Sequence, residues 1–338
     1  IGLAALALRL ANLTAYPLNN AEASQALAGL AIYMGGIPAE GYSPLLASLT
    51  SFALLLFGAA DWSARLIPAL FGTTLALLPF GLRKQLGVMG ALFASVLLAL
   101  SASTLFWSRA VSGDIAAATG AMLLLVGGVR FFSQMSGSGL ACLAVGLALL
   151  VLSSPAGFTA LVVTILLIAS ILIFNPPMRL ILQNWREENN AVLRRAGLIF
   201  VGLVLILATA ATFNITGLAA ISEMFNRWLG QFGLQAQPGA GLSAVIQMVL
   251  YEPLILLFGL IGAALAAYRR KPFSLLIVAW LAVAVLLDLL MGGRSGGQVL
   301  LAVVPLALLA GKQLGVLWDE WQTGIRPDGE GLLVGIGL

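Results

Sequence analysis

The sequence predicts an all-α protein that crosses a membrane about ten or eleven times. The mean hydropathy is +1.05, only 9% of the 338 residues are charged, and apolar runs of roughly 17 to 25 residues recur along the chain. Helical runs of that length match the ~30 Å hydrocarbon core of a bilayer. The runs are continuous and rich in Leu and Ala, whereas the strands of a membrane β-barrel are short and alternate in polarity.

Ten apolar runs are expected to span the membrane. A further run, residues 43–58, has only 16 residues, fewer than the about 20 that a crossing needs. Counting it as a span would invert the side of every later loop, so it is interpreted as a re-entrant or interfacial helix on the extracytoplasmic side. The ten predicted spans are 1–13, 62–82, 86–103, 114–131, 138–153, 157–175, 197–213, 242–267, 273–291 and 298–316.

The basic residues indicate the orientation. With a cytoplasmic N-terminus, Arg9, Arg65, Arg109, Arg227 and Arg294 fall on the extracytoplasmic side. The other twelve of the 17 basic residues fall on the cytoplasmic side, as the positive-inside rule requires. This distribution explains the pI near 9.6 without a nucleic-acid partner, and it predicts a multi-pass protein of a plasma (inner) membrane. The twelve are Arg83, Lys84, Arg130, Arg179, Arg186, Arg194, Arg195, Arg269, Arg270, Lys271, Lys312 and Arg326.

Three regions are expected along the chain. Residues 1–131 form a first membrane module with an extracytoplasmic loop at 14–61, and 132–317 carry the remaining spans. A second extracytoplasmic loop, 214–241, has apolar residues at helical spacing, which predicts an interfacial helix acting as an anchor or as a lid. Residues 318–338 are expected to form a cytoplasmic tail. Both ends look truncated, because each lies within an apolar run.

The residue types limit the chemistry. Histidine is absent and Cys142 is the one cysteine, which excludes imidazole metal sites, Ser-His triads and an internal disulfide. Any reaction must therefore use carboxylates, arginines, hydroxyls or a bound ion.

Charged residues on the extracytoplasmic side are the candidate site. Glu22 lies in the first turn of a short predicted helix, Arg109 and Asp114 lie in the stretch FWSRAVSGD, and Arg65 and Arg294 lie at helix ends. A guanidinium suits a phosphate, and a carboxylate suits general base catalysis or a hard cation. Structural alternatives stay open: Glu22 can complement a helix N-terminus, and Asp114 can pair with Arg109 or cap the next span.

Several motifs in the first 130 residues resemble a known family. They are similar in order and spacing to the membrane core of GT-C glycosyltransferases, in the branch of the protein O-mannosyltransferases and aminoarabinose transferases. That branch runs His-Pro-Pro-Leu, a Phe-Gly turn, Arg-Leu-Pro-Ser-Ala-Leu-x-Gly, a basic turn, and Ser-Arg followed by an Asp. The corresponding segments here are YSPL (42–45), FG (57–58), RLIPALFG (65–72), LRKQLG (82–87) and SRAVSGD (108–114).

The resemblance implies a GT-C-like bundle with extracytoplasmic juxtamembrane helices. It also implies transfer of a sugar from a polyprenyl-phosphate donor to a protein or glycolipid acceptor, outside the cytoplasm and among membrane lipids. By the resemblance, Glu22 would be the base or a metal contact, and Asp114 would either orient a group or help to hold Mg²⁺ or Mn²⁺. The phosphate would be bound by Arg65, Arg109 and Arg294, with Tyr42 at the position of the family's His.

The acidic motif departs from the family pattern. The segment NNAEA (19–23) keeps Glu22 but has Asn20 and Ala21 where the family has an Asp. Two alternatives to a transferase therefore stay open. One is a noncatalytic GT-C-like subunit of a larger membrane assembly, and the other is a transporter.

Overall fold

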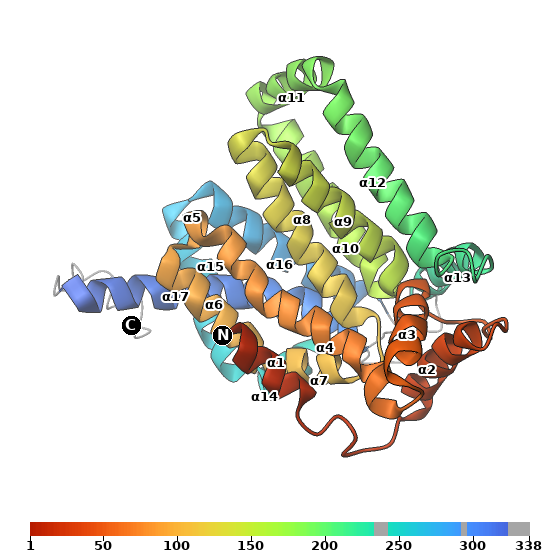
Figure 1. Cartoon of the computed structure of the whole chain (residues 1–338). Helices are drawn as coiled ribbons and strands as arrows, with labels where there is room; N and C mark the ends of the chain where they lie inside the picture. Colours follow the sequence, from red (N-terminus) through yellow and green to blue (C-terminus); the bar gives the residue numbers. More distant parts are fainter. Residues whose placement is uncertain (233–242, 292–295, 324–338) are drawn as a thin grey trace.

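The computed structural model describes residues 1–232, 243–291 and 296–323. The regular secondary structure of these residues is entirely helical. Helices α8, α9 and α10 run side by side, α12 stands at the edge of the bundle, and α2, α3 and α13 gather at one end, whereas α11 lies at the other (Figure 1). The predicted all-α polytopic membrane fold is confirmed.

Six helical segments are long and apolar enough to cross a membrane within the described residues, or up to eight if each of two bent pairs counts as one span. Their positions agree with predicted spans to within a few residues, with two exceptions. Helix α12 begins at Asn190 rather than near 197, and α17 continues to Thr323 rather than ending near 316. The six are α4 (Asp61–Leu77) with its continuation through η1 (Leu78–Leu82) and α5 (Arg83–Leu86), α8 (Asp114–Gln134), α10 (Pro155–Phe174), α12 (Asn190–Ala208), α16 (Pro272–Leu290), and η3 (Gly296–Val299) with α17 (Leu300–Thr323).

Two further predicted spans, 1–13 and 138–153, form helices of fewer than 18 residues. Helix α1 (Gly2–Leu10) has nine residues, about 14 Å of helix, so this segment does not cross a bilayer by itself. Helix α9 (Gly137–Ser153) has 17 residues and packs along α8 and α12. The short run 43–58 forms the 14-residue helix α3 (Pro44–Phe57); its place relative to the membrane stays a prediction.

Two predicted spans are broken. Helices α6 (Val88–Leu100) and α7 (Ala102–Arg109) meet at 55°, and α14 (Ser243–Tyr251) and α15 (Pro253–Arg269) meet at 113°. The predicted span 242–267 is therefore not one continuous helix but a pair of helices bent at Glu252. Pro253 explains the second break, because proline lacks an N–H for the preceding turn and disfavours helical geometry at the residue before it.

Opposite charges hold the two helix ends at the first break. The buried Arg9 donates to the carbonyl oxygens of Leu98 (3.2 Å) and Ala99 (3.4 Å), in the last turn of α6. The carboxylate of Glu252, which is also buried, accepts from Ser101 Oγ (2.6 Å) and Ser103 N (2.7 Å), at the start of α7. A cation at a helix C-terminus and an anion at an N-terminus both complement the helix dipole, so the bend in α6–α7 is stabilised from both sides.

Shorter helices lie outside the predicted spans. Helix α2 (Asn20–Tyr33) confirms the predicted helix that carries Glu22 in its first turn. A single residue separates helix α11 (Pro176–Glu188) from α12, which begins at Asn190. The loop 214–241 contains α13 (Gly217–Gly230); its residues from 233 on lie outside the described part.

The most buried element is α17, whose residues 300–310 are buried among the neighbouring helices α6, α15 and α16. Helix α8 packs against α9, α10 and α4. Asp114, the first residue of α8, and Gly296, the first residue of η3, line the same pocket. Residues of α2 and α13 line it as well.

Candidate functional site

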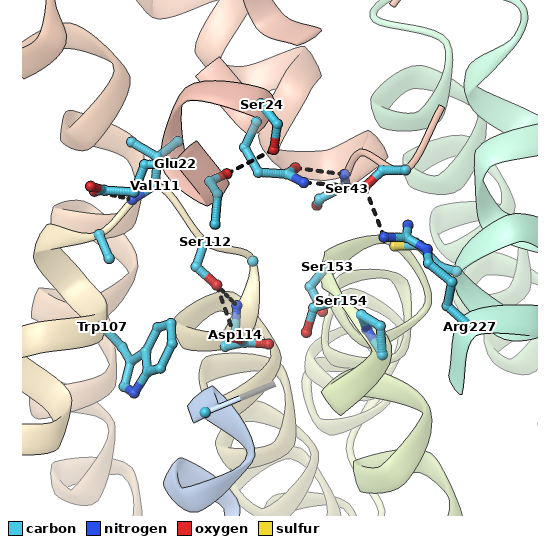
Figure 2. A pocket seen from close by; sticks show the side chains of 18 of the residues that line it. Glu22, Ser24, Ser43, Trp107, Val111, Ser112, Asp114, Ser153, Ser154 and Arg227 are labelled. Carbon is cyan, nitrogen blue, oxygen red and sulfur yellow. Dashed lines mark hydrogen bonds between the residues drawn. The ribbon is translucent and has the colours of Figure 1, made fainter. Parts of the chain in front are cut away.

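A pocket of about 730 Å³ lies at the end of the bundle where α2, α7, α13 and the start of α8 converge (Figure 2). Its walls carry Glu22 and Gln25 from α2, Trp107 from α7, Asp114 from α8 and Arg227 from α13. The junction between α9 and α10 adds the hydroxyls of Ser153 and Ser154. The pocket therefore combines two carboxylates, one guanidinium and several hydroxyl groups.

Asp114 is the first residue of α8 and only 4% exposed. Its Oδ2 accepts a hydrogen bond from Ser112 Oγ at 2.9 Å, and Ser112 Oγ accepts from the Asp114 N–H at 3.2 Å. The predicted alternative of an ion pair with Arg109 is absent: Arg109 donates instead to two backbone carbonyls.

Two glycines allow the chain to close around Asp114. A Cβ at Gly113 would overlap the carbonyl oxygen of Ser153, and a Cβ at Gly297 would overlap the Asp114 carboxylate. Neither position tolerates a side chain without a shift of its neighbour, so both backbone segments approach as closely as glycine permits. The position of the carboxylate is therefore fixed by packing on two sides.

Glu22 is saturated with hydrogen bonds. Its Oε1 accepts from Arg65 Nε (3.1 Å) and the Val111 N–H (3.0 Å), and its Oε2 accepts from Arg65 Nη2 (3.0 Å) and the Asn19 N–H (3.1 Å). An ionised carboxylate offers about four lone-pair sites, so the chain itself uses all of them. The bond from Asn19 belongs to a capping box at the start of α2.

The environment of Glu22 also determines its acidity. Burial by itself would raise the pKa of this carboxyl, but the hydrogen bonds from Arg65, Asn19 and Val111 outweigh burial and lower the pKa below its usual value. Glu22 is therefore firmly ionised, which makes it a weak proton acceptor.

Arg65 is saturated too. Besides its two bonds to Glu22, its Nη1 donates to the carbonyls of Leu13 (2.6 Å) and Tyr16 (2.8 Å), and its Nη2 donates to Pro17 (3.3 Å). All five N–H donors of the guanidinium are engaged within the chain. Arg65 fixes the segment between α1 and α2 and has no donor left for a phosphate in this arrangement.

Two other predicted donor-binding residues, Arg109 and Tyr42, have partners within the chain. Arg109 Nη2 donates to the carbonyls of Ala11 (2.7 Å) and Asn12 (3.1 Å), just after α1. Tyr42 is buried, and its hydroxyl accepts from Asn214 Nδ2 at 3.0 Å. Neither lines the pocket. Arg294 lies outside the described residues.

Arg227 is the cation that lines the pocket within the described part of the chain, and sequence reasoning had not included it in the site. Its Nη1 donates to the Gly41 carbonyl at 2.8 Å, and Glu223, one helical turn earlier, accepts from the Gly41 N–H at 3.2 Å. Gln25 Nε2 also donates to the Gly41 carbonyl (3.2 Å). The pair of Glu223 and Arg227 at helical spacing was the available signal, because it predicts a charged stripe on one face of the loop helix.

The nitrogen atoms of the Arg227 guanidinium differ in their hydrogen bonding. Nη1 is committed to Gly41, whereas Nε and Nη2 make no hydrogen bond to any described residue. Burial lowers the pKa of this guanidinium and the nearby Glu223 raises it, with a net lowering; the group nevertheless stays charged near neutral pH. Figure 2 shows Asp114 and Arg227 on opposite sides of the pocket, with Ser153 and Ser154 between them.

Comparison with known proteins gives a fold. No protein-family model and no curated protein sequence matches the chain. Solved structures do match, among them the following three. ArnT from Cupriavidus metallidurans in the apo state matches 90% of this chain and 57% of its own, at 15% identity and a TM-score of 0.60. The same protein bound to undecaprenyl phosphate matches 95% and 61%, at 15% identity and 0.69.

The third structure is the oligosaccharyltransferase of Archaeoglobus fulgidus in complex with Zn and sulfate. It matches 99% of this chain and 51% of its own, at 17% identity and a TM-score of 0.62. These proteins are GT-C glycosyltransferases. The chain has the GT-C fold. It spans between about half and three fifths of the length of these structures.

The carboxylate oxygens of Glu22 are not available as ligands of a divalent cation. Both oxygens of Glu22 already accept two N–H groups each, and two of these come from a guanidinium, which a cation would have to displace. Within the described residues no group of three or more His, Cys, Asp or Glu side chains is placed to hold a metal ion. The mechanism proposed below therefore uses no step through Mg²⁺ or Mn²⁺.

Proposed function

We propose that this chain is the membrane part of a glycosyltransferase that moves a sugar from a polyprenyl-phosphate donor to an acceptor on the extracytoplasmic side of a plasma membrane. The observation that carries the proposal is the polar pocket in a GT-C fold, with the buried Asp114 opposite Arg227. The neighbour ArnT was captured with undecaprenyl phosphate bound, which supports a donor of this lipid class.

Arg227 is proposed to bind the donor phosphate. Its Nε and Nη2 are available on a guanidinium whose Nη1 is held by Gly41, so the fork is oriented before the ligand arrives. When the bond between the sugar and the phosphate breaks, the phosphate leaves with the electron pair and gains negative charge. A fixed cation beside that charge stabilises the transition state, and loss of one such partner costs on the order of 10² to 10³ in rate.

Asp114 is proposed to accept the proton from the acceptor hydroxyl as that oxygen attacks the anomeric carbon. Its Oδ2 accepts from the hydroxyl of Ser112, which can rotate and donate elsewhere when an acceptor hydroxyl approaches. Glu22, by contrast, accepts from a guanidinium and two backbone N–H groups that cannot rotate away. The proposal thus assigns proton transfer to Asp114 and a positioning role to Glu22 and Arg65. The sequence-based assignment of Glu22 as base stays the alternative.

Turnover of a panel of polyprenyl-phosphate sugars by purified protein tests these roles. Asp114→Asn and Arg227→Ala are expected to lower turnover by about 10² to 10³, whereas Arg109→Ala, outside the pocket, serves as the control. If Asp114→Asn keeps normal turnover and a folded Glu22→Gln protein has none, Glu22 is the base instead. Donor binding without turnover in the unaltered protein would identify a noncatalytic subunit, and sugar uptake without transfer would identify a transporter.

A further inference from the structure

A second cavity, of about 880 Å³, lies at the opposite end of the bundle between α8, α10 and α16. Its walls are mostly apolar and include Leu124, Val163, Leu276 and Trp280. Helix α8 connects the two cavities, because Asp114 lines the first and Phe132 lines the second. The volume lies within the range of about 300 to 1,000 Å³ that is usual for sites of small ligands.

Basic residues surround the mouth of this cavity. Lys84, Arg130, Arg179 and Lys271 are exposed, and each is adjacent in sequence to a lining residue. None of these four side chains makes a hydrogen bond or an ion pair with another described residue. The end of the bundle that carries them is the one that the positive-inside rule assigns to the cytoplasm.

Lys312 adds a partly buried charge to the same place. Its Nζ donates to Ser274 Oγ at 2.6 Å and lies 5.9 Å from the ring centre of Phe273, which lines the cavity. The neighbouring charges that act on it are Lys271 and Arg269, both of the same sign. Within the described residues no carboxylate lies within 4.0 Å of Lys312. Like charges gathered without a counterion repel each other, so an anion at this position would be stabilised.

One polar atom inside the cavity also lacks a partner. Gln85 lines the cavity, and its Oε1 is buried without a hydrogen bond. A buried polar atom of this kind is normally satisfied by a ligand group or by water. The cavity therefore combines an apolar interior, an unsatisfied acceptor near its basic end and a ring of cations at its mouth.

We propose that this cavity binds an anionic phospholipid of the adjacent leaflet. An acyl chain would fill the apolar space between α8, α10 and α16, and the phosphate would contact Lys312 and Lys271 at the mouth. Basic pockets between membrane helices on the cytoplasmic side are a recognised way of binding anionic head groups. The lipid would also complete the packing between α10 and α16.

The phosphate of the proposed sugar donor cannot be the anion at this mouth. That phosphate is assigned to Arg227, at the other end of α8, and the 21 residues of α8 extend for about 31 Å. The lipid proposal does not depend on glycosyl transfer, so it can succeed or fail independently of the proposed function.

Gly128 offers a variant that fills the cavity without a collision. A Cβ at Gly128 meets no atom within 4 Å, and Gly128 lines the cavity, so Gly128→Leu places a side chain in the space of the acyl chain. Gly202 on α12 is the matched control, because a Cβ there also meets nothing and the residue lines neither cavity. Lys84→Gln/Lys271→Gln removes two charges from the mouth, and Arg194→Gln/Arg195→Gln removes two from α12 as its control.

Native mass spectrometry of the full chain, delipidated in mild detergent, measures binding of dioleoyl-phosphatidylglycerol, dioleoyl-phosphatidylcholine and undecaprenyl phosphate. Phosphatidylglycerol is expected to bind at least about tenfold tighter than phosphatidylcholine. Gly128→Leu should abolish this preference. Each charge removed from the mouth should weaken the binding of phosphatidylglycerol by about fivefold. Both control variants should bind the lipids as the unaltered protein does.

Two results would overturn the proposal. The first is equal binding of the two phospholipids, or equal behaviour of Gly128→Leu and Gly202→Leu. The second is that Gly128→Leu displaces undecaprenyl phosphate but not phosphatidylglycerol, which would show that the cavity receives a prenyl chain.

Discussion

Arg65 and Glu22 form a two-point ion pair, with Nε to Oε1 at 3.1 Å and Nη2 to Oε2 at 3.0 Å, and their side chains are only 8% and 9% exposed. The pair connects α4 to α2. Arg65 also donates to the Leu13 carbonyl in the segment before α2. Glu22 also accepts from the N–H of Val111, in the loop that leads to α8. One buried pair thus fixes three of the chain segments from which the pocket is built.

Replacing one partner of this pair is expected to be strongly destabilising. Arg65→Met should lower the free energy of unfolding by about 3 to 5 kcal/mol, because it leaves the Glu22 carboxylate buried without its cation. The double variant Glu22→Gln/Arg65→Met should recover part of this loss, and thermal unfolding in detergent measures both. Arg83→Met, at an exposed position, is the control. Equal stability of Arg65→Met and Arg83→Met would contradict the structural role of the pair.

The same pair predicts a dependence on pH. The folded-state pKa of Glu22 is lowered, because hydrogen bonds from Arg65 and two backbone groups outweigh the effect of burial. A lowered pKa contributes stability above the unfolded-state value near 4.5, and this contribution is lost as the pH falls below it through the folded-state pKa. Melting temperatures between pH 7 and pH 3 should therefore fall less steeply for Glu22→Gln than for the exposed control Glu40→Gln.

How far the sequence predicts this fold depends on what hydropathy can detect. The position of α8 follows from an apolar run that begins at Asp114, and the structure confirms it. The break at Glu252 was missed, since a hydropathy window averages over the Glu-Pro pair and records only that the segment is apolar. The charges that stabilise the neighbouring break, Arg9 and Glu252, are far apart in sequence, so no local pattern could pair them.

Part of the lining of the pocket could be predicted for a different reason. Charges are so scarce in the segments predicted to be extracytoplasmic that Glu22, Asp114 and Arg65 could be grouped by their predicted side alone. The structure brings Glu22 and Asp114 to one pocket. Charge by itself does not distinguish a ligand contact from an internal partner, so Arg65 was assigned to a phosphate although it is used by Glu22. Arg227 contacts Gly41 across 186 positions of sequence, a distance that pattern reading does not bridge.

Glu252 is expected to control the bend between α6 and α7. Glu252→Leu removes the acceptor of Ser101 Oγ and Ser103 N, and should cost about 1.5 to 3 kcal/mol of unfolding free energy, the usual range for a hydrogen bond to a charged group. Both bonds go to Oε1, so Glu252→Gln keeps an amide oxygen with two lone pairs that can accept both without the charge, and should cost less. Thermal unfolding of both variants checks the order. If Gln and Leu are equally tolerated, the carboxylate does not hold the bend.

Gly297 provides a separate test of Asp114. A Cβ at Gly297 overlaps the Asp114 carboxylate, so Gly297→Ala must displace that side chain. Gly230, which also lines the pocket but has open space at its Cβ, gives the matched control Gly230→Ala. If Asp114 accepts the proton, Gly297→Ala should lower kcat by about tenfold or more with little change in KM, because the base is moved while Arg227 still binds the donor phosphate. The readout is transfer from the polyprenyl-phosphate sugar identified with the unaltered protein.

A kcat for Gly297→Ala equal to that of Gly230→Ala would show that the reaction does not depend on the position of Asp114, and proton transfer would then have to be sought at Glu22.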